Sequence, residues 1–184
     1  MNTDTSAFEY FQQLSQKADQ KHKREEVEPA NEILLGICFG IENIAFVTEV
    51  TNLEAVIQPD KIYPFPVEQD GYWGLSTYQG ILFSVLDLKY ILNQARTIQN
   101  PEAKILIYRY HQAYIGFLVE KCLGLKSFDL SEKQSLPLKS GLFKKGFVHY
   151  SLYKEKTPWA VLEIFDLINH IHEGGVLGTF LVSG

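Results

Sequence analysis

Two short apolar runs on either side of a glycine constrain the fold of this chain more than any other feature. Residues 74–78 and residues 81–86 form the runs, and Gln79 and Gly80 separate them. Such runs are typical of a β-hairpin, because glycine adopts positive φ in a tight turn at little steric cost. Asp87 follows, where a carboxylate can accept hydrogen bonds from the first turn of a helix. Since apolar residues then recur at helical spacing, the stretch predicts strand, turn, strand and a short helix capped by Asp87.

Segments with the composition of strands also occur before and after this hairpin. Those before it are Ile33–Phe39, Ile44–Val47 and Leu53–Gln58. Those after it are Ile105–Tyr110, Ala113–Val119, Lys121–Phe128, Gly146–Tyr153 and Pro158–Ile164. Many short strands with few helices predict a mostly β protein made of small barrels or a sandwich. The strands fall into two barrel-like halves, roughly 33–92 and 104–164, which we expect to share one core.

The sequence also predicts the structure of three segments that follow strands. Thr48–Asn52 is compatible with a single helical turn, and Asp129–Lys145 predicts a long irregular segment. Glu163–His172 predicts a short helix that ends the domain. Each half would therefore end in a strand that is followed directly by a short helix. Each of these helices has an aspartate near its start. These aspartates are Asp87 and Asp166.

Composition divides the chain into three parts. Residues 1–30 predict a helix over Thr3–Lys23 followed by a charged linker, residues 31–173 the folded domain, and residues 174–184 a small apolar tail. The N-terminal helix has a narrow apolar stripe. It either packs on the domain, which we favour, or serves as an arm that binds a partner.

Charge and hydropathy limit the class of partner. The net charge of −5 over 184 residues disfavours nucleic acid, because phosphate binding needs a basic face. The N-terminus lacks the pattern of a signal peptide, and no apolar run approaches the ~18 residues of a transmembrane helix. We therefore expect a cytoplasmic protein without membrane insertion. Cys38 and Cys122 each lie in an apolar run and are expected to be buried free thiols.

The sequence contains no recognisable catalytic, cofactor-binding or metal-binding motif. It has neither Gly-x-Ser-x-Gly nor a glycine-rich phosphate loop. His170 and His172 form a close pair, but residues two apart on a helix face different ways, which favours a solvated helix end over a metal site. An enzyme is therefore disfavoured. The alternative that stays open is a small β-barrel enzyme or ligand-binding protein that uses His149 or His170 with nearby glutamates.

Several segments resemble the CheW-like domain family. Residues 74–88 are similar to its signature, roughly G-x-x-x-x-R-G-x-x-x-P-V-x-D-L. The other similar segments are Ile44–Val50, Tyr114–Leu125, Gly146–His149 and Trp159–Ile168. The resemblance covers about Glu32–His172. Within the family the chain is most similar to PilI-type adaptors of type IV pilus (twitching motility) chemosensory systems, through its N-terminal extension and the segments Leu123–Phe128 and Lys156–Trp159.

The resemblance implies two intertwined five-stranded β-barrels with short helices, preceded here by the N-terminal helix. It implies a non-enzymatic adaptor, without a cofactor, that couples a CheA-type histidine kinase to the cytoplasmic tip of a methyl-accepting chemotaxis receptor. One barrel face would contact the regulatory domain of the kinase, and the groove between the barrels would take the helical hairpin of the receptor. The other possibility within this family is a stand-alone homologue of the kinase regulatory domain that binds only the kinase array.

Two positions depart from the family signature. Gln79 stands where the family usually has Arg, and Ser84 stands where it usually has Pro. The family's Arg is associated with receptor and kinase coupling, and Gln lacks its fixed charge and fork geometry. The partner-binding candidates that the resemblance implies are Tyr78, Gln79, Ser84 and Glu49. The framework positions of the signature are Gly74, Gly80, Val85, Asp87 and Leu88. As a cap, Asp87 is expected to contribute about 0.5–2 kcal/mol.

Overall fold

The computed structural model describes residues 32–64, 66, 71–98, 100–135 and 146–173. By its internal contacts the chain divides into two units, Met1–Glu32 and Ile33–Gly184. The described residues belong almost entirely to the second unit. The expected N-terminal helix, the charged linker and the apolar tail lie outside them.

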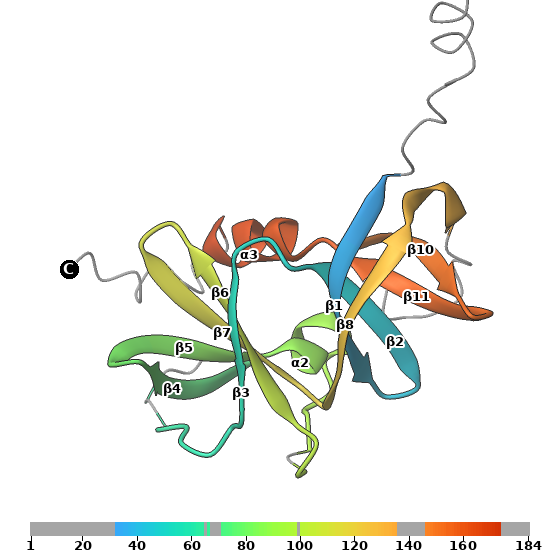
Figure 1. Ribbon diagram of the computed structural model, residues 1–184. Helices are drawn as coiled ribbons and strands as arrows, with labels where there is room; N and C mark the ends of the chain where they lie inside the picture. The colour runs from blue at the N-terminus through green and yellow to red at the C-terminus, as the bar shows by residue number, and fades with distance from the viewer. Residues whose placement is uncertain (1–31, 65, 67–70, 99, 136–145, 174–184) are drawn as a thin grey trace, which may run out of the picture. The chain divides into compact units, whose positions relative to one another are not determined.

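The strands of the described residues form two sheets, which Figure 1 shows as two groups of arrows. Sheet A has the order β8-β1-β2-β11-β10-β9, with β1 Ile33–Ile41, β2 Ile44–Glu49, β8 Lys121–Asp129, β9 Lys133–Ser135, β10 Val148–Lys154 and β11 Thr157–Leu162. Sheet B has the order β3-β6-β7-β5-β4, with β3 Leu53–Ile57, β4 Tyr72–Tyr78, β5 Ile81–Asp87, β6 Lys104–Tyr110 and β7 Ala113–Val119. The helices are α2 Leu88–Asn93, the 3-10 helix η1 Leu130–Glu132 and α3 Ile164–Glu173. In the described part of the chain, none of these helices has the length and apolarity needed to cross a bilayer. The expected mostly β fold is confirmed.

The hairpin expected from the sequence lies at one edge of sheet B. β4 and β5 pair in antiparallel, with Tyr78 opposite Ile81. Gln79 and Gly80 have φ values of 50° and 81°, and positive φ at both central residues is the geometry of a type I′ turn. This turn matches the right-handed twist of the strands that it joins. The prediction that Gly80 needs positive φ is therefore confirmed.

Each sheet curls around a core of its own. In sheet A, Phe128 of β8 meets Trp159 of β11 edge to face at 5.7 Å between ring centroids, although β1 and β2 separate these strands. In sheet B, the segment after β3 closes onto β4, because Tyr63 and Leu75 exchange backbone hydrogen bonds of 2.7 and 2.8 Å. Gly74 permits this approach, since a Cβ there would collide with the carbonyl oxygen of Tyr63. Both sheets thus have the closure of small barrels.

A third core lies between the two sheets and is called the shared core below. Sheet A contributes Ile37, Phe39, Ile41 and Phe46 among others. Sheet B contributes Leu86, Leu106, Tyr108 and Phe117 among others. Helices α2 and α3 add Leu88, Leu92, Ile164, Leu167, Ile168 and Ile171. Figure 1 shows α2 between the two groups of strands. The two barrels therefore share apolar packing rather than touching only at polar surfaces.

The sheets are not successive halves of the chain. Sheet B takes its strands from residues 53–119, whereas sheet A combines residues 33–49 with residues 121–162. The expected division into 33–92 and 104–164 does not match this arrangement. The reason is a parallel pairing of β2 with β11, which joins strands from opposite ends of the domain. The expectation that the barrels are intertwined agrees with the structure.

The two sheets repeat one arrangement of hairpin and helix. The backbone N–H of Asp87 donates to Gly71 O at 2.7 Å, and the N–H of Glu163 donates to Phe147 O at 2.9 Å. Each bond joins the end of a hairpin to its start, immediately before α2 or α3. The residue that corresponds to Asp87 is therefore Glu163. The predicted aspartate near the start of each helix is confirmed, but Asp166 lies inside the first turn of α3 and is exposed, so it does not occupy the position of Asp87.

Two connections also differ from expectation. Thr48–Asn52 forms no helical turn, because its first two residues extend β2 and a backbone hydrogen bond of 2.9 Å closes a tight turn before β3. Residues 130–135 form η1 and β9 rather than irregular chain. The rest of that predicted irregular segment, residues 136–145, lies outside the described residues.

Candidate interaction surfaces

Asp87 is fully buried, and its carboxylate links β4, α2 and the chain after α2 through hydrogen bonds. Its carboxylate accepts from Tyr90 N at 3.1 Å, so the predicted cap of α2 is confirmed. It also accepts from Trp73 Nε1 at 2.9 Å, from Thr97 N at 2.8 Å and from Thr97 Oγ1 at 2.7 Å. The bonds to Trp73 and Thr97 could not be predicted from the sequence, since they depend on how β4 and the chain after α2 fold back.

The signature residues around Asp87 serve the framework. Val85 and Leu88 are fully buried, in the core of sheet B and in the shared core respectively. Ser84 is only 4% exposed, and its hydroxyl interacts with the hydroxyl of Tyr72. Burial raises the pKa of Tyr72, and this hydrogen bond partly opposes the rise. A partner cannot reach Ser84, so its expected role as a partner contact is contradicted.

Tyr78, Gln79, Ile81 and Leu82 lie at the turn end of the β4–β5 hairpin, called the hairpin tip below; Tyr78 is half-buried and the other three residues are exposed. Gln79 is exposed, and its Nε2 donates to the hydroxyl of Tyr78 at 3.0 Å. Ile81 and Leu82 are exposed large apolar side chains. Two of the predicted partner contacts therefore lie together on one surface that combines polar and apolar groups.

A second exposed apolar surface lies on β1 and β8 and is called the β1–β8 patch. It consists of Ile33, Leu35, Leu123 and Leu125. Leu125 is 61% exposed and stands opposite Ile37, a shared-core residue. Since alternate residues of a strand share a face, Leu35 lies on the same side of β1 as Ile37. The patch therefore continues the shared core outward to solvent.

A pocket of about 250 Å³ adjoins this patch and shares Ile33 with it. Its walls come from β1, the end of β2, the junction of β11 with α3, and the side chains of Leu130 and Tyr150. Glu49, a predicted partner contact, and Glu163 line the pocket. Burial raises the pKa of Tyr150, and the negative charges of Glu163 and Glu49 raise it further. The pocket thus combines apolar side chains with polar ones, two of which are glutamates.

An ion-pair cluster joins α2 to the β1–β2 turn and the β7–β8 junction. Lys89 Nζ lies 2.8 Å from Glu120 Oε1 and 3.4 Å from Glu42 Oε1. The hydrogen bond to Glu120 is the main reason that the pKa of Lys89 is raised. This cluster could not be predicted from the sequence, because no short spacing links its members. It connects the two sheets at the point where the chain passes from one to the other.

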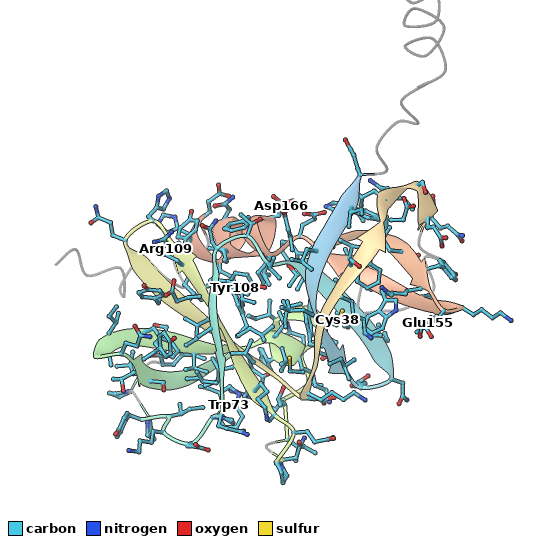
Figure 2. All side chains as sticks on the ribbon, in the orientation of Figure 1. Cys38, Trp73, Tyr108, Arg109, Glu155 and Asp166 are labelled. Atoms are coloured by element: carbon cyan, nitrogen blue, oxygen red, sulfur yellow. The ribbon has the colours of Figure 1, made fainter. Side chains whose placement is uncertain are left out.

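Three histidines of the described residues, His111, His170 and His172, lie against aromatic rings, and His149 lies near an aspartate. His149 Nε2 lies 3.9 Å from Asp166 Oδ2, and both side chains are more than half exposed. Figure 2 shows Asp166 on α3. His170 packs against Phe147 at 5.2 Å between ring centroids. Within the described ranges, no three His, Cys, Asp or Glu residues are grouped so that they could hold a metal ion.

Comparisons with known proteins agree with this geometry. The family described as "CheW-like domain" matches residues 35–172. "Chemotaxis protein CheW" of Thermotoga maritima is 29% identical over 89 residues, which cover 48% of this chain and 58% of that protein, less than two thirds of its length. The crystal structure of scaffolding protein TtCheW from Thermoanaerobacter tengcongensis has the same fold, with a TM-score of 0.62 at 14% identity, over 71% of this chain and 89% of that one. Because the family match spans most of the sequence, the chain belongs to the CheW-like domain family.

Proposed function

We propose that this protein is a chemosensory adaptor that couples a CheA-type histidine kinase to the cytoplasmic tip of a methyl-accepting chemotaxis receptor and catalyses no reaction itself. Membership of the CheW-like family supports this, as do relatives named as a chemotaxis protein and a scaffolding protein. The observation that carries the proposal is the β1–β8 patch with its adjoining pocket. Contiguous apolar surface on a soluble protein marks a binding site.

The receptor tip is the partner that we assign to the β1–β8 patch. A helical hairpin presents apolar residues at i, i+3 and i+4, which suits a surface made of Leu35, Leu125 and the pocket beside them. Glu49 and Glu163 would favour basic residues flanking that apolar stripe. The kinase regulatory domain is assigned to the hairpin tip, where Tyr78 and Gln79 supply polar contacts. Weak contacts of this kind suit an array, because many repeated contacts multiply modest affinities.

The assignment is tested with two leucines of matched exposure. Leu125 of the patch is 61% exposed and Leu82 of the hairpin tip is 58% exposed. Because a buried leucine contributes about 1.5–3 kcal/mol, Leu125→Asp should weaken binding of the purified receptor tip by about tenfold or more. Leu82→Asp should leave receptor binding within about twofold. Titration calorimetry measures both, and circular dichroism checks that each variant is folded.

Other outcomes separate the alternatives. Equal effects of the two substitutions on receptor binding would reject the patch as the receptor site. Binding to the kinase regulatory domain but never to any receptor tip would identify a stand-alone homologue of that domain. Failure of the unaltered protein to bind either partner would reject the adaptor function.

The adaptor is further proposed to act in the cytoplasm, at receptor arrays attached to the membrane, and to control type IV pilus twitching. The similarity of segments Leu123–Phe128 and Lys156–Trp159 to PilI-type adaptors supports this branch. A strain that lacks the gene should lose twitching on a surface, and the unaltered gene should restore it more fully than Leu125→Asp or Leu82→Asp, because each substitution alters a proposed partner site. Loss of swimming chemotaxis with normal twitching would place the protein in another chemosensory system.

A further inference from the structure

Two lysines of sheet A lie over aromatic rings where the edge strand β8 meets β10. Lys126 Nζ lies 5.7 Å from the ring centroid of Trp159, and Lys154 Nζ lies 5.6 Å from that of Phe128. Lys154 also donates to Ser127 O at 2.7 Å, which joins β10 to β8 through a side chain rather than through a backbone ladder. Lys126, Phe128, Lys154 and Trp159 are called the β8–β10 seam below.

The indole N–H of Trp159 is a buried donor without an acceptor. Trp159 is 8% exposed, and its Nε1 has no hydrogen-bond partner among the described residues. Trp73, the other tryptophan of the sequence, is paired, because its Nε1 donates to Asp87 Oδ2 at 2.9 Å. Since buried polar groups of proteins are normally hydrogen-bonded, the Trp159 N–H is available to an acceptor that a ligand supplies.

The positive charges of the seam are not neutralised within the described residues. None of the ion pairs there includes Lys126 or Lys154. Burial raises the pKa of the Cys38 thiol, and the charges of both lysines partly oppose this rise, so both ammonium groups act on the interior of sheet A. Cys38 packs in one core with Phe128 and Trp159. An acceptor that reaches the indole N–H would therefore meet two cations, which suits a carboxylate better than a neutral oxygen.

The seam is separate from the β1–β8 patch. Leu125 of the patch and Lys126 of the seam are neighbours on β8, so their side chains lie on opposite faces of the strand. The pocket beside the patch has none of the four seam residues in its walls. β8 is also an edge strand of sheet A, and an edge strand leaves backbone groups unpaired for an extended chain. These features favour a carboxylate carried by a chain segment over a free anion.

We propose that the β8–β10 seam binds a carboxylate side chain of an acidic segment from a partner protein. The carboxylate accepts from Trp159 Nε1 and lies against the ammonium groups of Lys126 and Lys154. The flexible stems of the two lysines cover the aromatic rings in the free protein and move aside to admit it. The site goes beyond the proposed adaptor function, because neither the β1–β8 patch nor the hairpin tip contains these residues.

The two indole N–H signals of the isotope-labelled full chain test this site. Nuclear magnetic resonance resolves one such signal for each tryptophan, and Trp159→Phe assigns them. The probe is a capped hexaglutamate peptide, which has no terminal charges. It should move the Trp159 signal downfield, as a new bond to a carboxylate requires, and leave the Trp73 signal in place, because that indole already donates to Asp87. A capped hexaglutamine peptide should move neither signal.

Lysine variants show whether the charges of the seam hold the peptide. Lys126→Gln and Lys154→Gln should each weaken its binding by about fivefold or more. Lys156→Gln removes the same charge from an exposed lysine of the neighbouring turn and should change binding by less than about twofold. Equal effects of the three substitutions would overturn the site, because they would indicate attraction to any nearby positive charge.

Sodium acetate at the same concentration of carboxylate separates a bound segment from a free anion. Acetate should move the Trp159 signal much less than the peptide does. An equal shift with acetate, or no shift of the Trp159 signal with the peptide, would overturn the proposal. Failure of the kinase and the receptor to bind would leave this result unaffected, because the peptide assay contains neither partner.

Discussion

Replacing Asp87 by alanine tests whether this carboxylate stabilises the domain as the centre of a hydrogen-bond network or only as a helix cap. The substitution removes the acceptor for four donors, which belong to Tyr90, Trp73 and Thr97. A lost cap alone costs about 0.5–2 kcal/mol. The structure adds three donors that the sequence did not predict, two of them on Thr97, which is 3% exposed.

The expected loss follows from those added donors. A buried donor left without an acceptor costs about 1–3 kcal/mol, and water cannot readily reach the two on Thr97. The indole of Trp73 is only half-buried, so water replaces part of its bond. Removing the charge also relieves a desolvation cost, which offsets part of the loss. We therefore expect Asp87→Ala to lower the free energy of unfolding by about 3–5 kcal/mol, more than a cap alone would contribute.

Urea unfolding followed by circular dichroism and by tryptophan fluorescence measures this change. Asp87→Asn should cost less, because its amide keeps one acceptor oxygen and turns its NH₂ group toward only two of the donors. Asp166→Ala is the matched control. Figure 2 shows Asp166 at the opposite end of the unit from Trp73, and an exposed aspartate there should change stability by no more than about 0.5 kcal/mol.

A loss below about 2 kcal/mol for Asp87→Ala would refute the network and leave only the cap. A double-mutant cycle with Thr97→Val gives a second check. Groups in one network show coupling of about 0.5–3 kcal/mol, so additive effects would mean that Asp87 and Thr97 stabilise the domain independently.

Three further changes are expected to be measurable in the same urea assay. Gly80→Val should cost about 1–2 kcal/mol because the turn needs φ of 81°, and Gly80→Asn should recover most of it; equal losses would reject the backbone argument. Gly116→Ala should cost about 1–3 kcal/mol, since a Cβ would lie 2.7 Å from Phe83 and 2.8 Å from Ile105; a neutral result would mean that these neighbours move aside. Burial raises the pKa of the Cys38 thiol from 9.0 to about 11, so its contribution to stability is complete below pH 9 and is lost as the pH rises toward 11. Cys38→Ala should make the stability fall less steeply across that range, and an unchanged slope would contradict the shift.

The local features of this protein could be predicted because they depend on residues close together in the chain. Gly80 sets the turn through its own φ, and Asp87 caps α2 through a donor three residues away. The strands expected at Ile105–Tyr110 and Ala113–Val119 formed as β6 and β7. One half of the hairpin tip, Tyr78 and Gln79, could likewise be selected from the signature as a candidate for partner binding.

The rest of the candidate sites depended on contacts between distant segments. Ser84 stands in the signature beside Val85, yet the pairing of β5 with both β4 and β7 places it inside the domain. The β1–β8 patch forms because β8 pairs with β1 across more than eighty residues of chain. The exposure of Leu35 and Leu125 could not be predicted from the sequence, since both lie in ordinary apolar runs.

The sequence by itself determined the hairpins, the cap at Asp87, the mostly β composition and the resemblance to the CheW-like family. These follow from periodicity and from backbone preferences that act over a few residues. Only the tertiary structure decided which strands share a sheet, that Glu163 rather than Asp166 corresponds to Asp87, and where apolar side chains stay open to solvent. The physical reason is that two parallel pairings, β2 with β11 and β5 with β7, join strands far apart in sequence, and no local pattern specifies such partners.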